Sequence, residues 1–275
     1  MLRLMFLLLS LAVAPAMAQP QAITIPAHPG EQAANGPAVL NAVLWQPAGR
    51  GPHAAIVLMH GCAGMTTRAG QPFARDTDWA RRLSALGYLI LQVDSLTPRN
   101  EGSLCGQGGD RRLRVSVERA RDAYAALLFL QTRPEVRADR IALMGWSNGG
   151  GTVLWTLSRD NRARPAGLRH DFAAGIAFYP GCKTLSERRD PWQPVASILL
   201  LVGEADDWTP APPCLTLAAR TGAYHDFDAP DTPQRVLRGV GATSSGTATI
   251  GTHPAAREDA LRRVPEFLAR MMPAR

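Results

Sequence analysis

A serine enclosed by glycines is the first residue of this sequence that could do chemistry. Ser147 lies in the segment Gly145-Trp146-Ser147-Asn148-Gly149, which fits the pattern Gly-x-Ser-x-Gly. The apolar residues 140–144 predict a strand before it, and residues 147–157 predict a helix that starts at the serine. In that setting a strained strand-to-helix turn exposes the hydroxyl as a nucleophile. The alternative is a glycine-rich helix start that Ser147 merely caps.

A serine hydroxyl becomes a good nucleophile when a histidine accepts its proton and a carboxylate orients that histidine. Two candidate acids, Asp206 and Asp207, follow the predicted strand 198–202 and come after the serine along the chain. His225 is the leading candidate base because it lies downstream of both carboxylates, in a loop-like segment of aromatic and acidic residues. The rival, His253, stands just before a predicted helix, and we interpret it as a capping residue.

A second loop of small residues supplies candidate hydrogen-bond donors. The segment His60-Gly61-Cys62-Ala63-Gly64 follows the buried strand 55–59, at the position where this kind of site keeps a backbone N–H for the developing oxyanion. We therefore predict that the N–H groups of Cys62 and Asn148 form an oxyanion hole. We interpret His60 as a hydrogen-bonded structural histidine.

These residues require a sheet whose strands end side by side. Short apolar and β-branched segments alternate with helical patterns, which is typical of a mostly parallel sheet with helices on both faces. The predicted strands are residues 39–45, 55–59, 88–93, 140–144, 175–178 and 198–202, and the predicted helices are residues 78–86, 113–130, 147–157 and 254–271. Residues 100–110 and 239–252 are expected to be loops. Serine, acid and histidine then follow in the chain order of an α/β-hydrolase fold.

The N-terminus has the features of a secretory signal. Arg3 precedes the apolar segment 4–13, and Ala16-Met17-Ala18 offers small residues for cleavage. We expect residues 1–18 to be a signal peptide and residues 19–275 to form one α/β-hydrolase domain, periplasmic or secreted. The apolar segment is shorter than the roughly 20 residues needed to span a bilayer, so no membrane partner is expected after cleavage.

The charge pattern argues against nucleic acid as a partner. The net charge is +7, but the arginines are scattered among acidic residues. The densest basic cluster, at residues 111–114, adjoins Asp110 and Glu118. Without a longer basic segment or interleaved aromatic residues, a solvated surface is the better interpretation.

Four cysteines in an exported chain permit disulfide bonds. Cys62 and Cys105 fall in loops expected at the C-terminal edge of the sheet, as do Cys182 and Cys214. From that shared edge we predict the pairs Cys62–Cys105 and Cys182–Cys214. Cys62 is not expected to be a nucleophile, because it lacks the strand-turn-helix setting of Ser147.

Six segments together resemble the dienelactone hydrolase family of α/β-hydrolases, over a stretch from about Leu40 to Leu268. These segments are residues 60–64, 139–150, 179–182, 203–210, 223–228 and 254–257. The resemblance implies Ser147 as nucleophile, Asp206 as the acid in preference to Asp207, and His225 as base. It also implies hydrolysis of a small-molecule lactone or other carboxylic ester, without a metal or cofactor.

Two features differ from that family's pattern. The family archetype has a cysteine where this chain has Ser147, which favours ordinary esters over a dienelactone as substrate. Only 18 residues separate Asp206 from His225. Within them, residues 212–220 predict about two helical turns, and residues 221–224 leave almost no room for a strand.

The short connection before His225 keeps a second class of function open. A protein that retained the fold without turnover would be a binding protein that uses the hydrolase pocket. A serine peptidase or an acyltransferase is a third possibility, because the three residues do not fix the acyl acceptor. In each case we expect Trp146 and Trp208 to flank the site as an apolar rim.

Overall fold

The computed structural model of the protein describes residues 19–32, 36–107, 113–214, 218–221 and 224–274. The predicted signal peptide, residues 1–18, and the arginines at 111 and 112 lie outside the described residues. Eight strands form the main sheet, in the order β1-β2-β4-β3-β5-β6-β7-β8. They are β1 (Gln21–Pro26), β2 (Val39–Trp45), β3 (His53–Met59), β4 (Leu89–Asp94), β5 (Val136–Trp146), β6 (Ala174–Phe178), β7 (Ser197–Gly203) and β8 (Ala218–Thr221).

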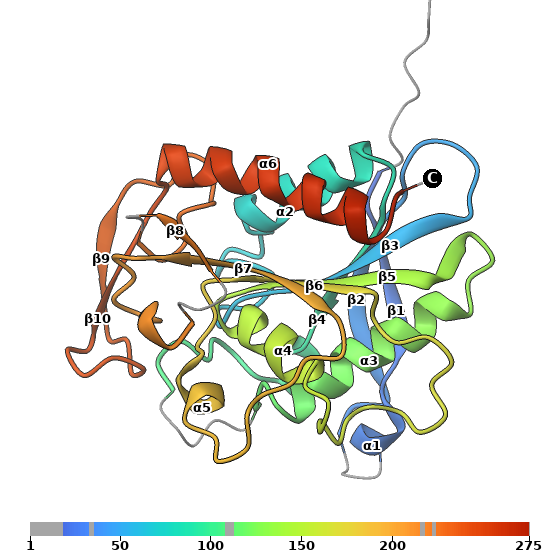
Figure 1. The fold of residues 1–275 in the computed structure, drawn as a ribbon, viewed down its shortest axis with the longest axis horizontal. Helices are drawn as coiled ribbons and strands as arrows, with labels where there is room; N and C mark the ends of the chain where they lie inside the picture. Colours follow the sequence, from blue (N-terminus) through green and yellow to red (C-terminus); the bar gives the residue numbers. More distant parts are fainter. Residues whose placement is uncertain (1–18, 33–35, 108–112, 215–217, 222–223, 275) are drawn as a thin grey trace, which may run out of the picture.

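The strands from β4 to β8 run parallel, whereas β1 and β2 pair antiparallel at one end of the sheet. Because parallel strands end at the same edge, the loops that follow β3, β5, β6 and β7 gather there (Figure 1). These are the loops that carry the candidate nucleophile, acid and oxyanion donors. The predicted mostly parallel α/β-hydrolase fold is confirmed.

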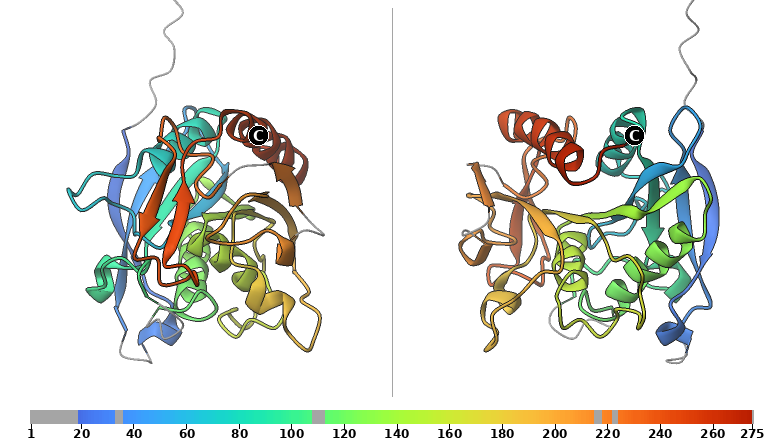
Figure 2. Two further views of the ribbon diagram at one scale, coloured as in Figure 1. Left: turned by 90° about the vertical axis from the view of Figure 1, so that its left-hand side faces the viewer. Right: turned by 45° about the vertical axis from the view of Figure 1, so that its right-hand side comes forward.

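Helices cover both faces of the sheet. The helices α2 (Ala74–Ala85) and α6 (Pro254–Met271) lie side by side on one face, while α3 (Glu118–Gln131) and α4 (Asn148–Thr156) cover the other (Figures 1 and 2). Shorter helices are α1 (Pro29–Gln32), η1 (Thr97–Arg99), α5 (Lys183–Ser186) and η2 (Pro212–Cys214). Among the described residues, no helix is both long enough and apolar enough to cross a membrane.

The core is divided by the sheet into two apolar clusters, and strand β3 shows how. Val57 packs into the cluster beneath α3 and α4, whereas its neighbours Ile56 and Leu58 pack into the cluster beneath α2 and α6. Side chains alternate between the faces of a strand. A strand buried on both faces must therefore be apolar throughout, which accounts for the unbroken apolar composition of this segment.

Several boundaries differ from the sequence-based expectation. Helix α2 begins at Ala74 instead of residue 78, and α3 begins at Glu118 instead of residue 113. The late start of α3 has a local cause, because the Glu118 carboxylate accepts a hydrogen bond from the Arg114 N–H and ends the preceding turn. Residues 239–252 are not a simple loop. They include β10 (Thr247–Ile250), which pairs antiparallel with β9 (Arg235–Arg238) in a separate hairpin (Figure 2).

Candidate active site

The serine turn connects β5 to α4 as the sequence predicts. Ser147 has a positive φ of 53°, a conformation that a non-glycine residue adopts only under strain. A hydrogen bond of 2.9 Å from the Ser147 N–H to the Phe178 carbonyl oxygen holds the turn against β6. Only glycine fits at position 149, because a Cβ there would lie 2.1 Å from the Met59 carbonyl oxygen.

The side chains of His225 and Asp206 are hydrogen-bonded. His225 Nδ1 lies 2.9 Å from Asp206 Oδ2, and each residue is 4% exposed. An ionised carboxylate can only accept hydrogen bonds, so Nδ1 carries the proton and Nε2 is left as an acceptor. The other carboxylate oxygen, Oδ1, accepts the N–H groups of Trp208 at 2.9 Å and Thr209 at 2.8 Å. The acid is therefore held on both of its oxygens.

Ser147 and His225 line the same cavity, which has a volume of about 550 Å³. Ser147 is largely buried, at 8% exposed, so a ligand would reach it through a cavity that it lines. A second cavity, of about 460 Å³, also reaches Ser147. The serine thus stands where two ligand-sized spaces meet.

The chain reaches His225 by a route that differs from the expected one. The described parts of residues 212–220 are not the two helical turns that were expected. They contain the short helix η2, and β8 (Ala218–Thr221) adds a parallel strand beside β7. His225 itself pairs with Ile250 at the end of β10, where the Gly251 N–H donates to the His225 carbonyl oxygen at 3.2 Å. The later hairpin therefore fixes the backbone of His225.

Asp207 has a different role from its neighbour Asp206. Its side chain lies against β10, where it accepts hydrogen bonds from the Thr249 N–H at 2.8 Å and the Thr249 hydroxyl at 3.0 Å. Asp207 is exposed, and the structure brings it to the hairpin and Asp206 to the histidine.

The two other candidate histidines have structural partners. His253 Nδ1 accepts the Ala256 N–H at 3.2 Å and so caps α6. His60 is 2% exposed, and its Nε2 accepts the Ser95 N–H at 3.1 Å. Burial lowers the pKa of His60 well below its ordinary value, and the nearby guanidinium of Arg119 lowers it further. His60 is therefore a neutral, hydrogen-bonded histidine.

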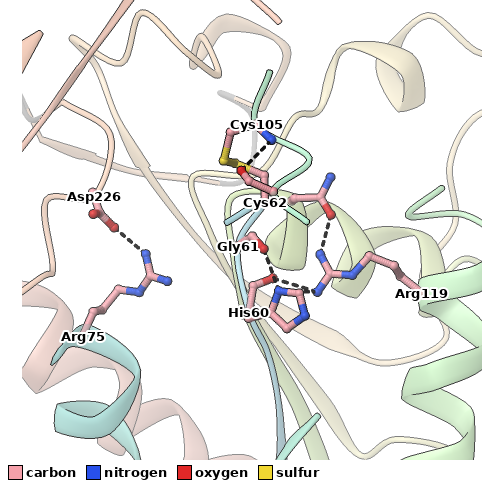
Figure 3. The surroundings of a disulfide bond; sticks show 9 residues. His60, Gly61, Cys62, Arg75, Cys105, Arg119 and Asp226 are labelled. Carbon is pink, nitrogen blue, oxygen red and sulfur yellow. Dashed lines mark hydrogen bonds and ion pairs between the residues drawn. A yellow bond between two sulfur atoms is a disulfide. The ribbon is translucent and has the colours of Figure 1, made fainter. Parts of the chain in front are cut away.

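The loop with the first candidate oxyanion donor is fastened on two sides. The Cys62 carbonyl oxygen accepts the Leu104 N–H at 2.8 Å, and a disulfide joins Cys62 to Cys105 (Figure 3). Neither the Cys62 N–H nor the Asn148 N–H donates to another residue in the part of the chain that the structure describes. Both remain available for a ligand oxygen.

A buried arginine connects the two segments that carry these donors. Arg119 is fully buried on α3, and its guanidinium donates to the His60 carbonyl oxygen at 2.8 Å and to the Asn148 side-chain oxygen (Figure 3). A guanidinium presents its donors in a rigid plane. Arg119 therefore sets the spacing between the loop after β3 and the start of α4.

Both predicted disulfides are present. Cys62 pairs with Cys105, and Cys182 pairs with Cys214. All four residues follow strands at the edge where the candidate site lies. The prediction that Trp146 forms part of an apolar rim is wrong, because this side chain is fully buried beneath the serine turn.

The buried carboxylate of Asp228 joins the serine turn to the histidine segment. Its Oδ2 accepts the indole N–H groups of Trp79 at 2.7 Å and Trp146 at 2.8 Å, and its Oδ1 accepts the Tyr179 hydroxyl at 2.6 Å. The Tyr179 ring in turn packs on His225, with ring centroids 4.5 Å apart. Burial raises the pKa of Asp228, although the charge of Arg75 opposes that shift. Asp228 thereby contacts one residue next to Ser147 and one that packs on His225.

Arg75 on α2 is a charged residue in the wall of the first cavity. It forms an ion pair with Asp76. A second ion pair joins it to Asp226, the residue after His225 (Figure 3). Burial by itself would raise the pKa of Asp226, but the charge of Arg75 and the other interactions of this carboxylate, among them hydrogen bonds from Arg75 and Tyr179, together leave the pKa below its ordinary value. The cavity wall therefore holds a compensated pair of charges in place of a free cation.

Sequence reasoning assigned no role to Arg75, Arg119, Tyr179 or Asp228. Tyr179 and Asp228 stand inside two of the segments that carry the family resemblance, and this was a usable signal. The arginines lie on helices in ordinary amphipathic surroundings. Nothing in their sequence context indicates that they reach the site.

The described residues contain no group of three or more His, Cys, Asp or Glu side chains arranged to hold a metal ion. The cavities are lined chiefly by apolar side chains and by the residues already described.

The sheet topology, the strained turn at Ser147 and the small-residue loop after β3 define the fold as an α/β-hydrolase fold. The sequence profile of the Dienelactone hydrolase family matches residues 40–272, and the chain belongs to that family. The family is one of hydrolases, so the protein is a member of a hydrolase family.

Similar proteins extend this finding. The chain is 43% identical over 118 residues to a Fusarium vanettenii protein named "Probable dipeptidyl-aminopeptidase B", which covers 39% of this chain and 12% of that relative. It is 28% identical over 182 residues to a Bradyrhizobium protein named "Probable 2-oxo-3-(5-oxofuran-2-ylidene)propanoate lactonase", covering 61% of this chain and 65% of the relative. A solved dienelactone hydrolase-like promiscuous phosphotriesterase from metagenomic libraries has a TM-score of 0.61 at 18% identity, covering 92% of this chain and 99% of that one.

Proposed function

We propose that the protein is an exported serine hydrolase that cleaves carboxylic esters or lactones through an acyl-enzyme intermediate. The observation that carries the proposal is the 2.9 Å contact between His225 and Asp206 beside a cavity that His225 shares with Ser147. The similarity to a relative named as a lactonase is a second support.

The geometry supports an ordinary acyl-transfer sequence. His225 Nε2 accepts the proton as the Ser147 hydroxyl oxygen bonds to the substrate carbonyl carbon, and Asp206 stabilises the charged imidazole. The N–H groups of Cys62 and Asn148 donate to the oxyanion. His225 then returns the proton to the departing alkoxide, and a water molecule repeats the sequence to release the acid.

Ester hydrolysis by the purified protein tests this proposal. We expect turnover of 4-nitrophenyl butyrate, and a loss on the order of 10⁴-fold or more in turnover for Ser147→Ala or His225→Ala. Ser84→Ala is the matched control, because Ser84 is also buried, lies outside both cavities, and has a hydroxyl with no partner among the described residues. This variant should keep full activity.

The same experiment separates the alternatives. A wild-type protein that hydrolyses no ester or lactone but binds one would be a binding protein on this fold. The similarity to a relative named as a dipeptidyl-aminopeptidase favours one further candidate, a serine peptidase. Release of 4-nitroaniline from dipeptidyl 4-nitroanilides, faster than from matched esters, would assign the peptidase function.

Export is part of the proposal. The two disulfides support it, because such bonds persist in oxidising compartments. Mass spectrometry of the protein from the periplasm and the medium of a bacterial host should find a mature N-terminus at Gln19. Full-length protein in the reduced cytoplasm alone would contradict export without touching the proposed chemistry.

A further inference from the structure

Two cavities meet at Ser147, and their arrangement limits the shape of the substrate. The first has a volume of about 550 Å³ and the second about 460 Å³. Cys62, Ser147 and Trp208 line both of them, whereas His225 lines only the first. Each volume falls in the range of about 300 to 1,000 Å³ that holds a drug-sized ligand, so there is room for a sizeable group on either side of the serine.

Both cavities offer apolar surface. Phe73 and Leu237 line the first, where the buried charge of Arg75 is compensated by Asp226. Its other charged residues, Asp231 and Arg235, are exposed to solvent. Val115 and Trp155 line the second, and the amine of Lys183 at its rim is mainly in solvent. Neither space offers an uncompensated buried charge, so apolar groups fit both.

Trp208 forms the boundary between the two spaces. Its ring packs on His225, with centroids 4.8 Å apart, and against the apolar cluster that includes Cys62 and Leu104. The backbone N–H of Trp208 donates to Asp206 Oδ1 at 2.9 Å, and this bond fixes the backbone that carries the ring. The ring and the Cys62–Cys105 disulfide therefore lie between the cavities, next to Ser147.

We propose that the substrate is an open-chain ester with a bulky apolar group on each side of the scissile bond, one group in each cavity, and that Trp208 enforces this division. The inference rests on the proposed function. Ser147 Oγ bonds to the carbonyl carbon, the carbon–alkoxy bond breaks, and the alcohol leaves with the proton held by His225. Water then releases the acid.

A small-ring lactone fits this geometry less well. Its alkoxy oxygen remains tethered to the acyl chain, so the ring occupies one side of the serine and leaves the other cavity empty. An open-chain ester places its two halves in divergent directions from the carbonyl carbon. Only the open-chain substrate gains binding energy from both cavities in the transition state.

A matrix of substrates tests the proposal. Four esters combine an acetyl or 4-phenylbutanoyl group with ethanol or 2-(2-naphthyl)ethanol, and δ-valerolactone and dihydrocoumarin represent lactones. Each kcat/KM is divided by the rate constant for hydroxide hydrolysis. Each bulky group should raise the corrected value by about tenfold or more, since burial of even one methylene discriminates by that factor. The ester with both bulky groups should exceed both lactones.

Faster corrected hydrolysis of either lactone than of that ester, or a fall in kcat/KM when a bulky group is added on either side, would overturn the inference. Hydrolysis of no substrate by the wild type would instead defeat the proposed function itself. These two failures are therefore distinguishable in one data set.

Filling each cavity separately sharpens the test. A Cβ on Gly151 would lie no nearer than 3.7 Å to a neighbour, so Gly151→Leu projects into the second cavity, with Gly151→Ala as the fold control. Leu237→Trp fills the first cavity. One variant should abolish only the rise in corrected kcat/KM that the bulky acyl group gives. The other variant should abolish only the rise that the bulky alcohol gives. Loss of the same gain in both variants contradicts the division.

Trp208 has its own readout. Trp208→Ala joins the two spaces, and we expect the corrected preference for the doubly bulky ester over dihydrocoumarin to fall by about tenfold, whatever happens to overall activity. Trp208→Phe retains an aromatic partition and should retain the preference. An unchanged preference in Trp208→Ala would remove Trp208 from the proposal.

Discussion

The carboxylate of Asp207 accepts two hydrogen bonds from Thr249, at 2.8 and 3.0 Å, on the strand that ends beside His225. Asp206 meanwhile bonds directly to the imidazole of His225. Two adjacent aspartates are therefore connected to His225 in different ways. Asp206 bonds to the imidazole, whereas Asp207 bonds to the hairpin that pairs with the His225 backbone.

These two aspartates should differ in their effect on turnover. Asp206→Asn should lower kcat by about 10³ to 10⁴, because the imidazole loses the acceptor that fixes its tautomer. Asp207→Asn should lower it by about tenfold or less, and Thr249→Val, which removes only the hydroxyl donor, by less again. Equal losses in the two aspartate variants, measured by steady-state kinetics with 4-nitrophenyl butyrate, would contradict the assignment.

Asp228 should be a large contributor to stability. Asp228→Leu would leave the indole N–H groups of Trp79 and Trp146 and the Tyr179 hydroxyl without their acceptor, and each buried unpaired group costs about 1 to 3 kcal/mol. Urea denaturation should therefore show a loss of more than about 3 kcal/mol. Asp228→Asn should lose less, since its oxygen can still accept both indoles while Tyr179 donates to Asp226.

A matched control for that experiment lies on α4. The hydroxyl of Thr156 is buried and has no hydrogen-bond partner among the described residues. Thr156→Val keeps the shape and removes the unpaired group, so its free energy of unfolding should equal or exceed that of the wild type. A large loss in this variant would show that buried polar groups here have partners beyond those described.

The two disulfides should separate activity from stability. They close loops of 43 and 32 residues, so loss of either bond should lower the free energy of unfolding by about 4 kcal/mol. Only the double variant Cys62→Ser, Cys105→Ser should also lower kcat, by about tenfold or more, because it loosens the loop with a proposed oxyanion donor. The comparison is with the double variant Cys182→Ser, Cys214→Ser, assayed with a small ester while both proteins remain folded. Equal kcat values in the two double variants would count against that donor.

The stability that the contact between α2 and α6 contributes should depend on pH. Burial would raise the pKa of Asp78, but hydrogen bonds from Arg257 and Arg82 outweigh it and leave the pKa below its ordinary value. A lowered folded-state pKa means that the carboxylate stabilises the fold above the ordinary value near 4 and loses that contribution as pH falls through the lowered value. Asp78→Asn should thus be less stable than wild type by about 1 kcal/mol at pH 7. The gap should close in acid, and a gap that widens toward low pH would refute the sign.

Local sequence pattern was sufficient for the central part of the fold. The strands around residues 55–59 and 140–144 are apolar because both of their faces are buried, so composition alone reveals them. The turn at Ser147 is equally local, since strand, glycine and helix follow one another within a few residues. Both disulfides followed from the rule that parallel strands end at one edge.

Contacts between distant segments could not be read in this way. The edge strand β8 contains Ala218, Ala219 and Arg220, which have no strong preference for a strand, and its neighbour β7 supplies the reason that it is one. The hairpin of β9 and β10 was hidden by glycine and serine between its strands. Asp228 collects donors from α2, β5 and the segment after β6, a relationship that exists only in the folded chain.

The two strands of the β9–β10 hairpin make different contacts beside the first cavity. On β9, Arg235 and Leu237 line the first cavity. On β10, Ile250 lines it too and also pairs with His225, while Thr249 donates hydrogen bonds to Asp207. Substitutions on β9 should therefore change which ligands fit while the pairing of Ile250 with His225 stays in place. Under the proposed function, this arrangement would give the enzyme an evolutionary route to new substrates through single substitutions on one strand.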